Sequence, residues 1–264
     1  MADFQRLMLS GRAPGVVQVT MSRPEVFNAF DEAMIGELDA VFGQLSEDAA
    51  VRVIVLAGAG KHFSAGADLQ WMQRASVAAR EWNLEDARRF AAMLHRIDDC
   101  PKPTIARVHG AALGGGVGLA CVCDIAIASE EASFSISEAK FGILPAVIGP
   151  YLINAVGRRQ ARRLALTATR IGCAQAQAIG LVHRVVPAGQ IDSAIDDCVA
   201  ELLAGGPAAQ REIKQLFGAL AVGPVTGEVR ELTAQTISRV RGTEEAREGF
   251  AAFLAKRPAN WILR

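Results

Sequence analysis

The first half of the chain alternates between short apolar runs and longer segments in which apolar residues recur every three or four positions. The short runs are typical of buried strands, and the longer periodicity is typical of amphipathic helices. The clearest predicted helix follows Asp31, a residue type that favours the N-cap, and continues to about Ser46. A more charged helix is predicted over residues 79–97. The predicted strands are Phe4–Leu9, Val16–Met21, Val51–Gly58, Pro103–Gly110 and Asp124–Ser129, with a turn over Gly11–Gly15.

The pattern changes at about Ala188, after which only helical spacing remains. Glycine–proline pairs separate some of these later segments, as expected between helices. We therefore predict an α/β fold with parallel strand pairing over residues 1–187 and a helical region over residues 188–264. The predicted C-terminal helices are Ile191–Leu203, Ala208–Leu220, Glu228–Val240 and Glu244–Leu254.

Length and charge narrow the function classes. The chain has 264 residues, of which 51% are hydrophobic and 21% charged, so it can bury a sizeable core. Its 28 basic and 28 acidic residues give a formal net charge of zero, so nothing favours a nucleic acid or an anionic membrane as partner. No apolar run is long enough to cross a membrane, and the N-terminus lacks the pattern of a signal peptide.

The cysteines and histidines indicate a cytoplasmic protein without a metal site. The five cysteines are odd in number and lie mostly in apolar or helical segments, so we expect them to be reduced. Neither the Cys-x-Cys pair at 121–123 nor the scattered histidines has the spacing of a metal site. These residues are Cys100, Cys121, Cys123, Cys173 and Cys198, and His62, His95, His109 and His183.

Three consecutive glycines, Gly114–Gly116, lie between two apolar runs. Because glycine weakens a helix interior by about 1 kcal/mol relative to alanine, they predict a close approach of the backbone to another group. A phosphate loop does not fit, since the P-loop lysine is absent and Leu119 replaces the third glycine of the dinucleotide fingerprint. A Gly-x-Ser-x-Gly nucleophile motif is also absent. The glycines therefore predict helix N-terminal N–H groups that face a carbonyl oxygen on which negative charge develops.

A carbonyl clamp of this kind needs a second N–H donor. The segment Lys61–Met72 is a suitable source because it follows a predicted strand. Its Ala-Gly-Ala sequence at 65–67 is small enough for close backbone approach. The sequence thus predicts two short loops that hold one carbonyl oxygen between them.

These segments resemble the enoyl-CoA hydratase/isomerase (crotonase) superfamily. The resemblance rests on FSAGADL at 63–69 and HGAALGGGVGLACVCDIAIAS at 109–129. It continues in RPEVFNAFDEAM near the start, in ISEAKFGILP at 136–145, and in EGFAAFLAKRPANW near the end. It implies a crotonase-like spiral of ββα units with the CoA site over residues 1–187. The helices over 188–264 would then mediate trimerisation, giving a homotrimer or a dimer of trimers.

The resemblance also implies the substrate and the residues that bind it. The substrate would be an acyl-CoA thioester, so coenzyme A is part of the substrate and no separate cofactor is expected. The two oxyanion N–H groups would belong to Ala67 and Gly115. Lys61 and Lys256 are candidates for the CoA phosphates, and Met72 and Trp82 for the acyl pocket. The implied substrate-binding residues are Val26, Phe27, Ala29, Ala65, Asp68, Leu69, Trp71, Gly114 and Gly118.

The reaction depends on the acid and base. The family glutamate in ISEAKFGILP is Glu138, and its apolar surroundings favour burial and a raised pKa. A second glutamate, present in two-carboxylate hydratases, is replaced by Gly118. The leading interpretation is hydration of a 2-enoyl-CoA. The alternatives are a Δ3-Δ2 enoyl-CoA isomerase that uses Glu138 alone, and an acyl-CoA-binding scaffold without catalysis.

One branch of the superfamily resembles this chain most in detail. SAGADLQWM and GILPAVIGPYLINAVGRRQARRLALTATR are similar to bacterial methylglutaconyl-CoA and isohexenylglutaconyl-CoA hydratases, which act in leucine and acyclic terpene breakdown. An acidic glutaconyl group would need a cation near the acyl end. The candidates are Arg74, Arg80, Arg158 and Arg159.

Overall fold

The computed structural model describes residues 4–220 and 222–262 and shows a mixed α/β fold. A large sheet has the strand order β1-β2-β3-β4-β6-β9, in which only the β1–β2 pair is antiparallel. A second, smaller sheet has the order β5-β7-β8. The strands are β1 (Leu7–Ala13), β2 (Val16–Met21), β3 (Val53–Gly58), β4 (Thr104–Val108), β5 (Ala111–Leu113), β6 (Ile125–Ser129), β7 (Ser133–Ser135), β8 (Ile171–Gly172) and β9 (Arg184–Val186).

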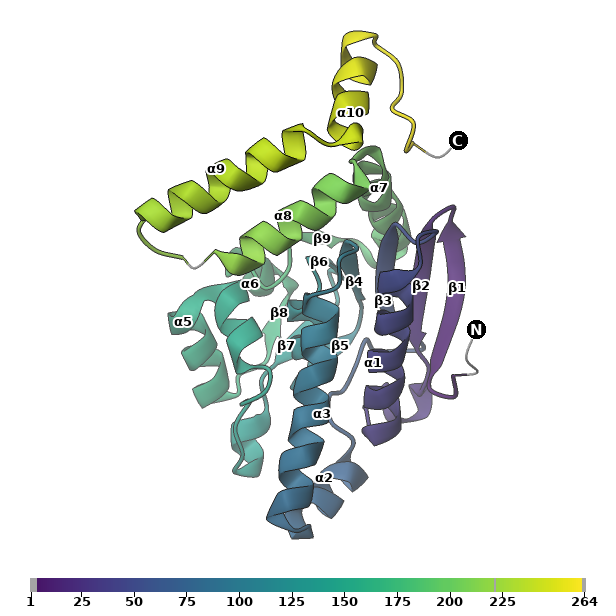
Figure 1. Cartoon of the computed structure of the whole chain (residues 1–264). Helices are drawn as coiled ribbons and strands as arrows, with labels where there is room; N and C mark the ends of the chain where they lie inside the picture. The colour runs from purple at the N-terminus through teal and green to yellow at the C-terminus, as the bar shows by residue number, and fades with distance from the viewer. Residues whose placement is uncertain (1–3, 221, 263–264) are drawn as a thin grey trace.

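Helices cover the large sheet and extend beyond it (Figure 1). Two successive strand–strand–helix units, β4-β5-α4 and β6-β7-α5, each place one strand in the large sheet and the next in the small sheet. This alternation confirms the expected ββα arrangement. The helices are α1 (Glu32–Glu47), α2 (Leu69–Val77), α3 (Arg80–Asp98), α4 (Gly115–Cys121), α5 (Gly149–Thr167), α6 (Cys173–Ala178), α7 (Ile191–Ala204), α8 (Pro207–Ala219), α9 (Gly227–Arg241) and α10 (Glu244–Leu254), with short 3₁₀ turns η1 (Pro24–Val26), η2 (Glu138–Phe141) and η3 (Ala188–Gln190).

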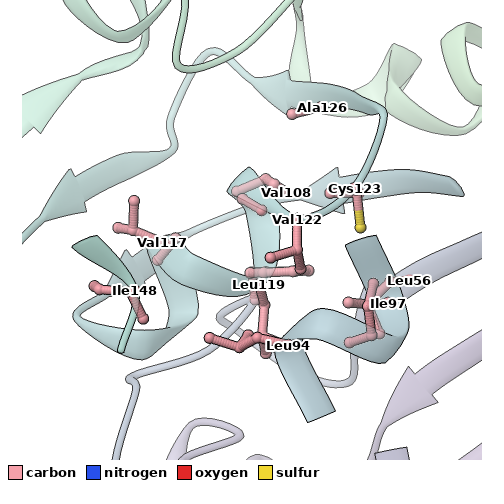
Figure 2. Close-up of a cluster of buried hydrophobic side chains, with 14 of the residues drawn as sticks. Leu56, Leu94, Ile97, Val108, Val117, Leu119, Val122, Cys123, Ala126 and Ile148 are labelled. Carbon is pink, nitrogen blue, oxygen red and sulfur yellow. The ribbon is translucent and has the colours of Figure 1, made fainter. Parts of the chain in front are cut away.

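The main core lies on the face of the large sheet that α1, α3 and α4 cover. Helix α1 begins as predicted, because the Asp31 side chain accepts a hydrogen bond from the Met34 N–H at 3.0 Å. Its apolar stripe packs with α3, which lies beside it (Figure 1). Helix α4 is buried along almost its whole length, among side chains such as Leu94, Ile97 and Ile148 (Figure 2). The glycine-rich helix is therefore surrounded by packed core on several sides.

The opposite face of the sheet is covered by α7. Side chains alternate along β3, so Ile54 and Leu56 face the main core while Val53 and Val55 face α7. Helix α7 buries Ile191, Ile195 and neighbouring residues there. Helices α8 and α9 bury no residue fully, and α10 buries only Ala252. The helices that follow α7 are therefore much less buried against the rest of the chain than α7 is.

Most predicted elements agree with the structure, and the first hairpin is the main exception. The predicted strand Phe4–Leu9 is wrong in its bounds, since β1 runs from Leu7 to Ala13. The turn predicted over Gly11–Gly15 is too long, because β1 stays paired with β2 through an irregular register between Gly11 and Ala13. Backbone pairing therefore overrides the turn propensity of Gly11.

Some predictions about chemistry and location can be compared with the structure. All five cysteines are free, which agrees with the reduced state expected of them. Within the described residues, no helix is both long and apolar enough to span a membrane. The cytoplasmic location and the functional division at residue 187 stay predictions.

Candidate active site

A cavity of about 790 Å³ opens between the loops that follow β2, β3 and β5 and the segment 137–148. It collects the predicted site residues from distant parts of the chain. Among the implied catalytic and substrate-binding residues Gly118 is the exception, since it is buried behind Ile148. The predicted residues that line the cavity are Val26, Phe27, Ala29, Ala65, Ala67, Asp68, Leu69, Trp71, Met72, Gly114, Gly115 and Glu138.

The glycine triplet is explained by three different neighbours. Gly114 has a φ of +49°, and a Cβ built on it would lie 3.0 Å from Glu138 Oε1. A Cβ on Gly115 would meet the ring of Phe30 at less than 3.0 Å. A Cβ on Gly116 would meet the carbonyl oxygen of Ser64 at 2.5 Å. Each glycine therefore allows one close approach, and the first brings the carboxyl group of Glu138 to the start of α4.

The two predicted N–H donors lie on loops in direct contact. Ser64 pairs with β5, where the Leu113 N–H donates to the Ser64 carbonyl oxygen at 3.0 Å. Gly66 has a φ of +84°, and a Cβ on it would collide with the Leu113 carbonyl and lie 3.3 Å from the Gly115 nitrogen. This contact brings Ala67 and Gly115 to the same end of the cavity.

Both N–H groups are available to a ligand. Within the described residues, neither the Ala67 N–H nor the Gly115 N–H donates to a protein acceptor. Gly115 is the first residue of α4, so its N–H has no partner inside the helix and lies at the positive end of the helix dipole. Two free backbone donors that line one cavity have the arrangement that a carbonyl clamp requires.

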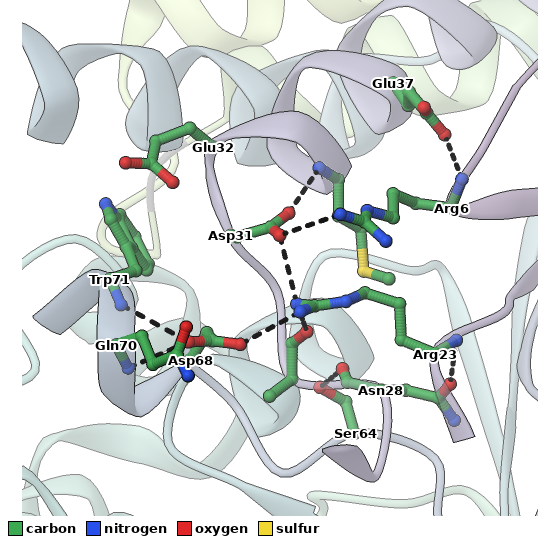
Figure 3. Close-up of polar contacts among 12 residues, drawn as sticks. Arg6, Arg23, Asn28, Asp31, Glu32, Glu37, Ser64, Asp68, Gln70 and Trp71 are labelled. Carbon is green, nitrogen blue, oxygen red and sulfur yellow. Dashed lines mark hydrogen bonds and ion pairs between the residues drawn. The ribbon is translucent and has the colours of Figure 1, made fainter. Parts of the chain in front are cut away.

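Buried polar contacts fix the loop that carries Ala67 (Figure 3). Asp68 caps α2 by accepting hydrogen bonds from the N–H groups of Gln70 and Trp71 at 2.8 and 3.3 Å. Arg23 pairs with Asp68 at 3.1 Å and with Asp31 at 3.3 Å. Burial raises the pKa of Asp68, but these backbone hydrogen bonds and Arg23 outweigh burial and lower it below its usual value. Asp68 therefore stays ionised and holds the loop in place.

The turn after β2 is locked to the same loop. Phe27 and Asn28 both have left-handed backbone conformations, with φ values of 56° and 55°. The buried Asn28 amide group donates to the carbonyl oxygens of Ala59 and His62 at 2.7 and 2.8 Å. The Ser64 hydroxyl donates to the Asn28 carbonyl oxygen at 2.8 Å. These bonds offset the backbone strain and connect the predicted CoA-binding turn to the Ala67 loop.

Glu138 has the properties of a proton shuttle. Its Oε2 atom is buried and has no hydrogen-bond partner among the described residues. Burial raises the pKa of Glu138 above its usual value, although the backbone N–H groups of Glu138 and Ser137 act in the opposite direction. The carboxyl group thus lies next to Gly114 with an oxygen free to exchange a proton.

An alkyl side chain takes the place of a second carboxylate. A Cβ on Gly118 would collide with Ile148 Cγ2, and Ile148 lines the cavity while being only 2% exposed. The other carboxyl groups among the described lining residues are those of Asp68, which Arg23 pairs, and Glu25, which is exposed. Glu138 is therefore the one carboxyl group of the described lining that is neither exposed nor paired with a cation.

Several lining residues were missed by the sequence analysis. Phe30 and Phe90 form an aromatic cluster with Trp71, with ring centroids 5.2 to 6.3 Å apart. One feature of the sequence could have identified Phe30 as a lining residue, since Phe30 directly follows the predicted CoA-binding turn. The predicted residues Lys61, Arg74, Arg80, Trp82, Arg158, Arg159 and Lys256 do not line the cavity.

The contact between Gly118 and Ile148 predicts a stability effect. Gly118→Ala should lower the free energy of unfolding by about 1–3 kcal/mol, because the added methyl group overpacks against Ile148. The matched control is Gly36→Ala in α1, where a Cβ meets nothing within 4 Å and improves helix propensity. Urea unfolding of both variants is the measurement. A Gly118→Ala protein as stable as Gly36→Ala would contradict the crowding at Ile148.

Comparison with known proteins agrees with this geometry. The family model described as enoyl-CoA hydratase/isomerase matches residues 11–263. The short-chain-enoyl-CoA hydratase of Clostridium acetobutylicum is 32% identical over 92% of each chain. A solved structure of an enoyl-CoA hydratase from Shewanella pealeana is 39% identical, covers 98% of this chain and 96% of its own, and superposes with a TM-score of 0.94. The chain belongs to the enoyl-CoA hydratase/isomerase family and is an enzyme of the hydratase type.

Proposed function

We propose that this enzyme adds water to a 2-enoyl-CoA with Glu138 as its only acid–base group. The observation that carries the proposal is the position of the Glu138 carboxyl group, whose Oε2 has no hydrogen-bond partner, beside Gly114 and next to the two free N–H donors. The Glu138 carboxylate takes a proton from water as the water oxygen bonds to C3 of the substrate. The same carboxyl group then delivers that proton to C2, so a hydrogen and a hydroxyl group are added across the double bond.

The two N–H groups stabilise the intermediate of this reaction. Attack at C3 moves the electron pair of the double bond toward the thioester oxygen and produces an enolate. The Ala67 and Gly115 N–H groups would bind that oxygen. In other enzymes the loss of one such donor costs about 2.7–4 kcal/mol of transition-state stabilisation. Coenzyme A enters as part of the substrate, so the scheme needs no separate cofactor.

The lining of the cavity favours an acyl group without charge. Among the described lining residues, the only cation is Arg23, and it is paired with Asp31 and Asp68. The aromatic cluster of Phe30, Trp71 and Phe90 and the segment around Ile148 offer apolar contacts. The methylglutaconyl-type substrate that the sequence resemblance suggests is the alternative, and its terminal carboxylate would need a cation from outside this lining.

An isomerase remains the second candidate because of Ile148. With Ile148 in place of a second carboxylate, one carboxyl group can also move a proton from C4 to C2 of a 3-enoyl-CoA. Hydration is preferred because the relatives reported above are named as hydratases. A scaffold without catalysis is disfavoured by the presence of Glu138 together with both free donors.

We also propose that the protein assembles as a homotrimer or a dimer of trimers through its C-terminal helices. Helices α8–α10 expose large apolar side chains that the rest of this chain leaves uncovered. Covering such side chains is the usual source of association free energy. They include Ile213, Phe217, Leu232, Ile237, Phe250, Phe253 and Leu254.

Glu138→Gln tests the acid–base assignment. The variant should lose about 10²–10⁴-fold in kcat while binding an acyl-CoA product as the wild type does. Because the base must be ionised and its pKa is raised, wild-type kcat/KM should fall as the pH drops through that raised pKa, and the residual activity of the variant should lack this acid limb. Loss of enoyl thioester absorbance measures both effects. The exposed Glu130→Gln variant is the control, and unchanged turnover in Glu138→Gln would show that the base is another group.

Two matched substrates test the acyl specificity. 3-Methylcrotonyl-CoA and 3-methylglutaconyl-CoA share a branched C3 and differ in the terminal carboxylate. The uncharged substrate should have a kcat/KM at least about 10-fold higher, because a buried unpaired carboxylate is costly. Product analysis with crotonyl-CoA and a 3-enoyl-CoA separates hydration from isomerisation. Faster hydration of 3-methylglutaconyl-CoA would contradict the uncharged class and require a cation near the acyl end.

Sedimentation velocity tests the assembly. The wild type should sediment as three or six chains of 28.0 kDa. Phe253→Asp, on α10 and 82% exposed in the single chain, should shift the distribution toward smaller species. Val77→Asp, 85% exposed on α2, is the control and should leave the distribution unchanged. A wild-type protein that sediments as a monomer at micromolar concentration would contradict the assembly.

A further inference from the structure

One buried aromatic residue contacts both halves of the carbonyl clamp. Phe30 is fully buried at the end of the turn that follows β2. Its N–H donates to the Gly66 carbonyl oxygen at 2.8 Å, and its carbonyl oxygen accepts from the Asp68 N–H at 3.0 Å. These two bonds bracket Ala67 on both sides, as a one-residue parallel bridge between Phe30 and Ala67. The backbone of Phe30 therefore fixes the peptide plane that carries the first donor.

The side chain of the same residue contacts the second donor. The tip of the Phe30 ring, at Cζ, occupies the space where a side chain on Gly115 would begin. Cε1 and Cε2 of the ring lie 3.0 and 3.2 Å from that same point. Gly115 thus rests on the edge of an aromatic ring, and its backbone cannot move toward Phe30 without a collision.

The Phe30 ring is itself held in place. Its centroid lies 5.2 Å from that of Phe90 and 6.2 Å from that of Trp71, with interplanar angles of 42° and 53°. Tilted aromatic contacts of this kind resist reorientation of the ring. Helices α2 and α3, which carry Trp71 and Phe90, therefore support the position of the ring under Gly115.

We propose that Phe30 is a positioning residue that sets the spacing between the Ala67 and Gly115 N–H groups, through its backbone on one side and its ring edge on the other. The inference rests on the proposed carbonyl clamp and adds a residue to it. A clamp must match the position of the developing oxyanion, and a misplacement of about 1 Å can cost about 100-fold in rate. A shorter side chain at Phe30 would leave the Ala67 peptide anchored and let Gly115 settle away from the oxygen.

Phe30→Leu tests this role by shortening the side chain without changing the backbone hydrogen bonds. We expect kcat to fall by about 10–100-fold, with KM changed by less than about threefold. Phe42→Leu is the matched control, because Phe42 is also fully buried but lies in α1 outside the cavity lining. It should lose similar stability and keep the wild-type kcat. Phe30→Met, which retains more of the buried volume, replaces Phe30→Leu if the latter does not fold.

A spectroscopic readout separates positioning from a general loss of structure. 4-Dimethylaminocinnamoyl-CoA is a chromophoric enoyl thioester whose conjugated amino group disfavours the addition of water. Its absorption should shift to longer wavelength on binding to the wild type, because the clamp polarises its carbonyl group. The shift should shrink in Phe30→Leu and Phe30→Met and stay intact in Phe42→Leu. A full shift in the Phe30 variants, or a kcat equal to that of Phe42→Leu, would overturn the role of Phe30. If the wild type shifts the probe but hydrates no enoyl-CoA, the proposed reaction fails while this test of Phe30 still holds.

Discussion

The site depends on the close packing of two backbone loops with no side chain between them. Gly66 of the first loop packs against the Leu113 carbonyl of the second loop, and Gly116 of the second packs against the Ser64 carbonyl of the first. Each loop therefore supplies one glycine and one carbonyl group to the interface between the two loops. A Cβ at either position would push the loops apart, and the two N–H donors would no longer converge. The close contact between the two loops thus requires the small residues of both motifs. This contact keeps the Ala67 and Gly115 N–H groups near enough to bind one carbonyl oxygen.

Most of the charged groups at the site are paired with one another. Arg23 is shared between Asp31 and Asp68, so a cation and two carboxylates form a nearly self-contained group at the edge of the cavity. The remaining lining is mostly apolar, and Glu138 is its one carboxyl group that is neither exposed nor paired with a cation. An apolar lining strengthens the interaction between a backbone N–H and a developing oxyanion, and it also raises the pKa of Glu138. The apolar lining therefore favours both the binding of an oxyanion by the two N–H groups and proton transfer by Glu138.

The sequence predicted the elements that depend on local pattern. The Asp31 N-cap, the helix that follows it and the four C-terminal helices agree with the structure to within a few residues, because capping and apolar periodicity are local properties. The positions of Ala67, Gly115 and Glu138 came from motifs that the family resemblance identified. The roles of Phe30 and Ile148 could not be predicted in this way, because each depends on a contact with a glycine far away in the sequence, where no side chain leaves a pattern to follow.

Gly118 illustrates how far such a contact changes the interpretation. In the sequence it is a missing carboxylate, and its absence keeps an isomerase and a scaffold open as alternatives to the leading hydratase interpretation. In the structure Gly118 packs against Ile148. The Ile148 Cγ2 methyl group fills the space that a side chain at Gly118 would occupy, and Ile148 lines the cavity at this point. A glutamate could not simply be restored at Gly118, since Ile148 would have to move as well. The two residues therefore act as a pair, and in the proposed mechanism they leave one carboxyl group, that of Glu138, to take and return the proton.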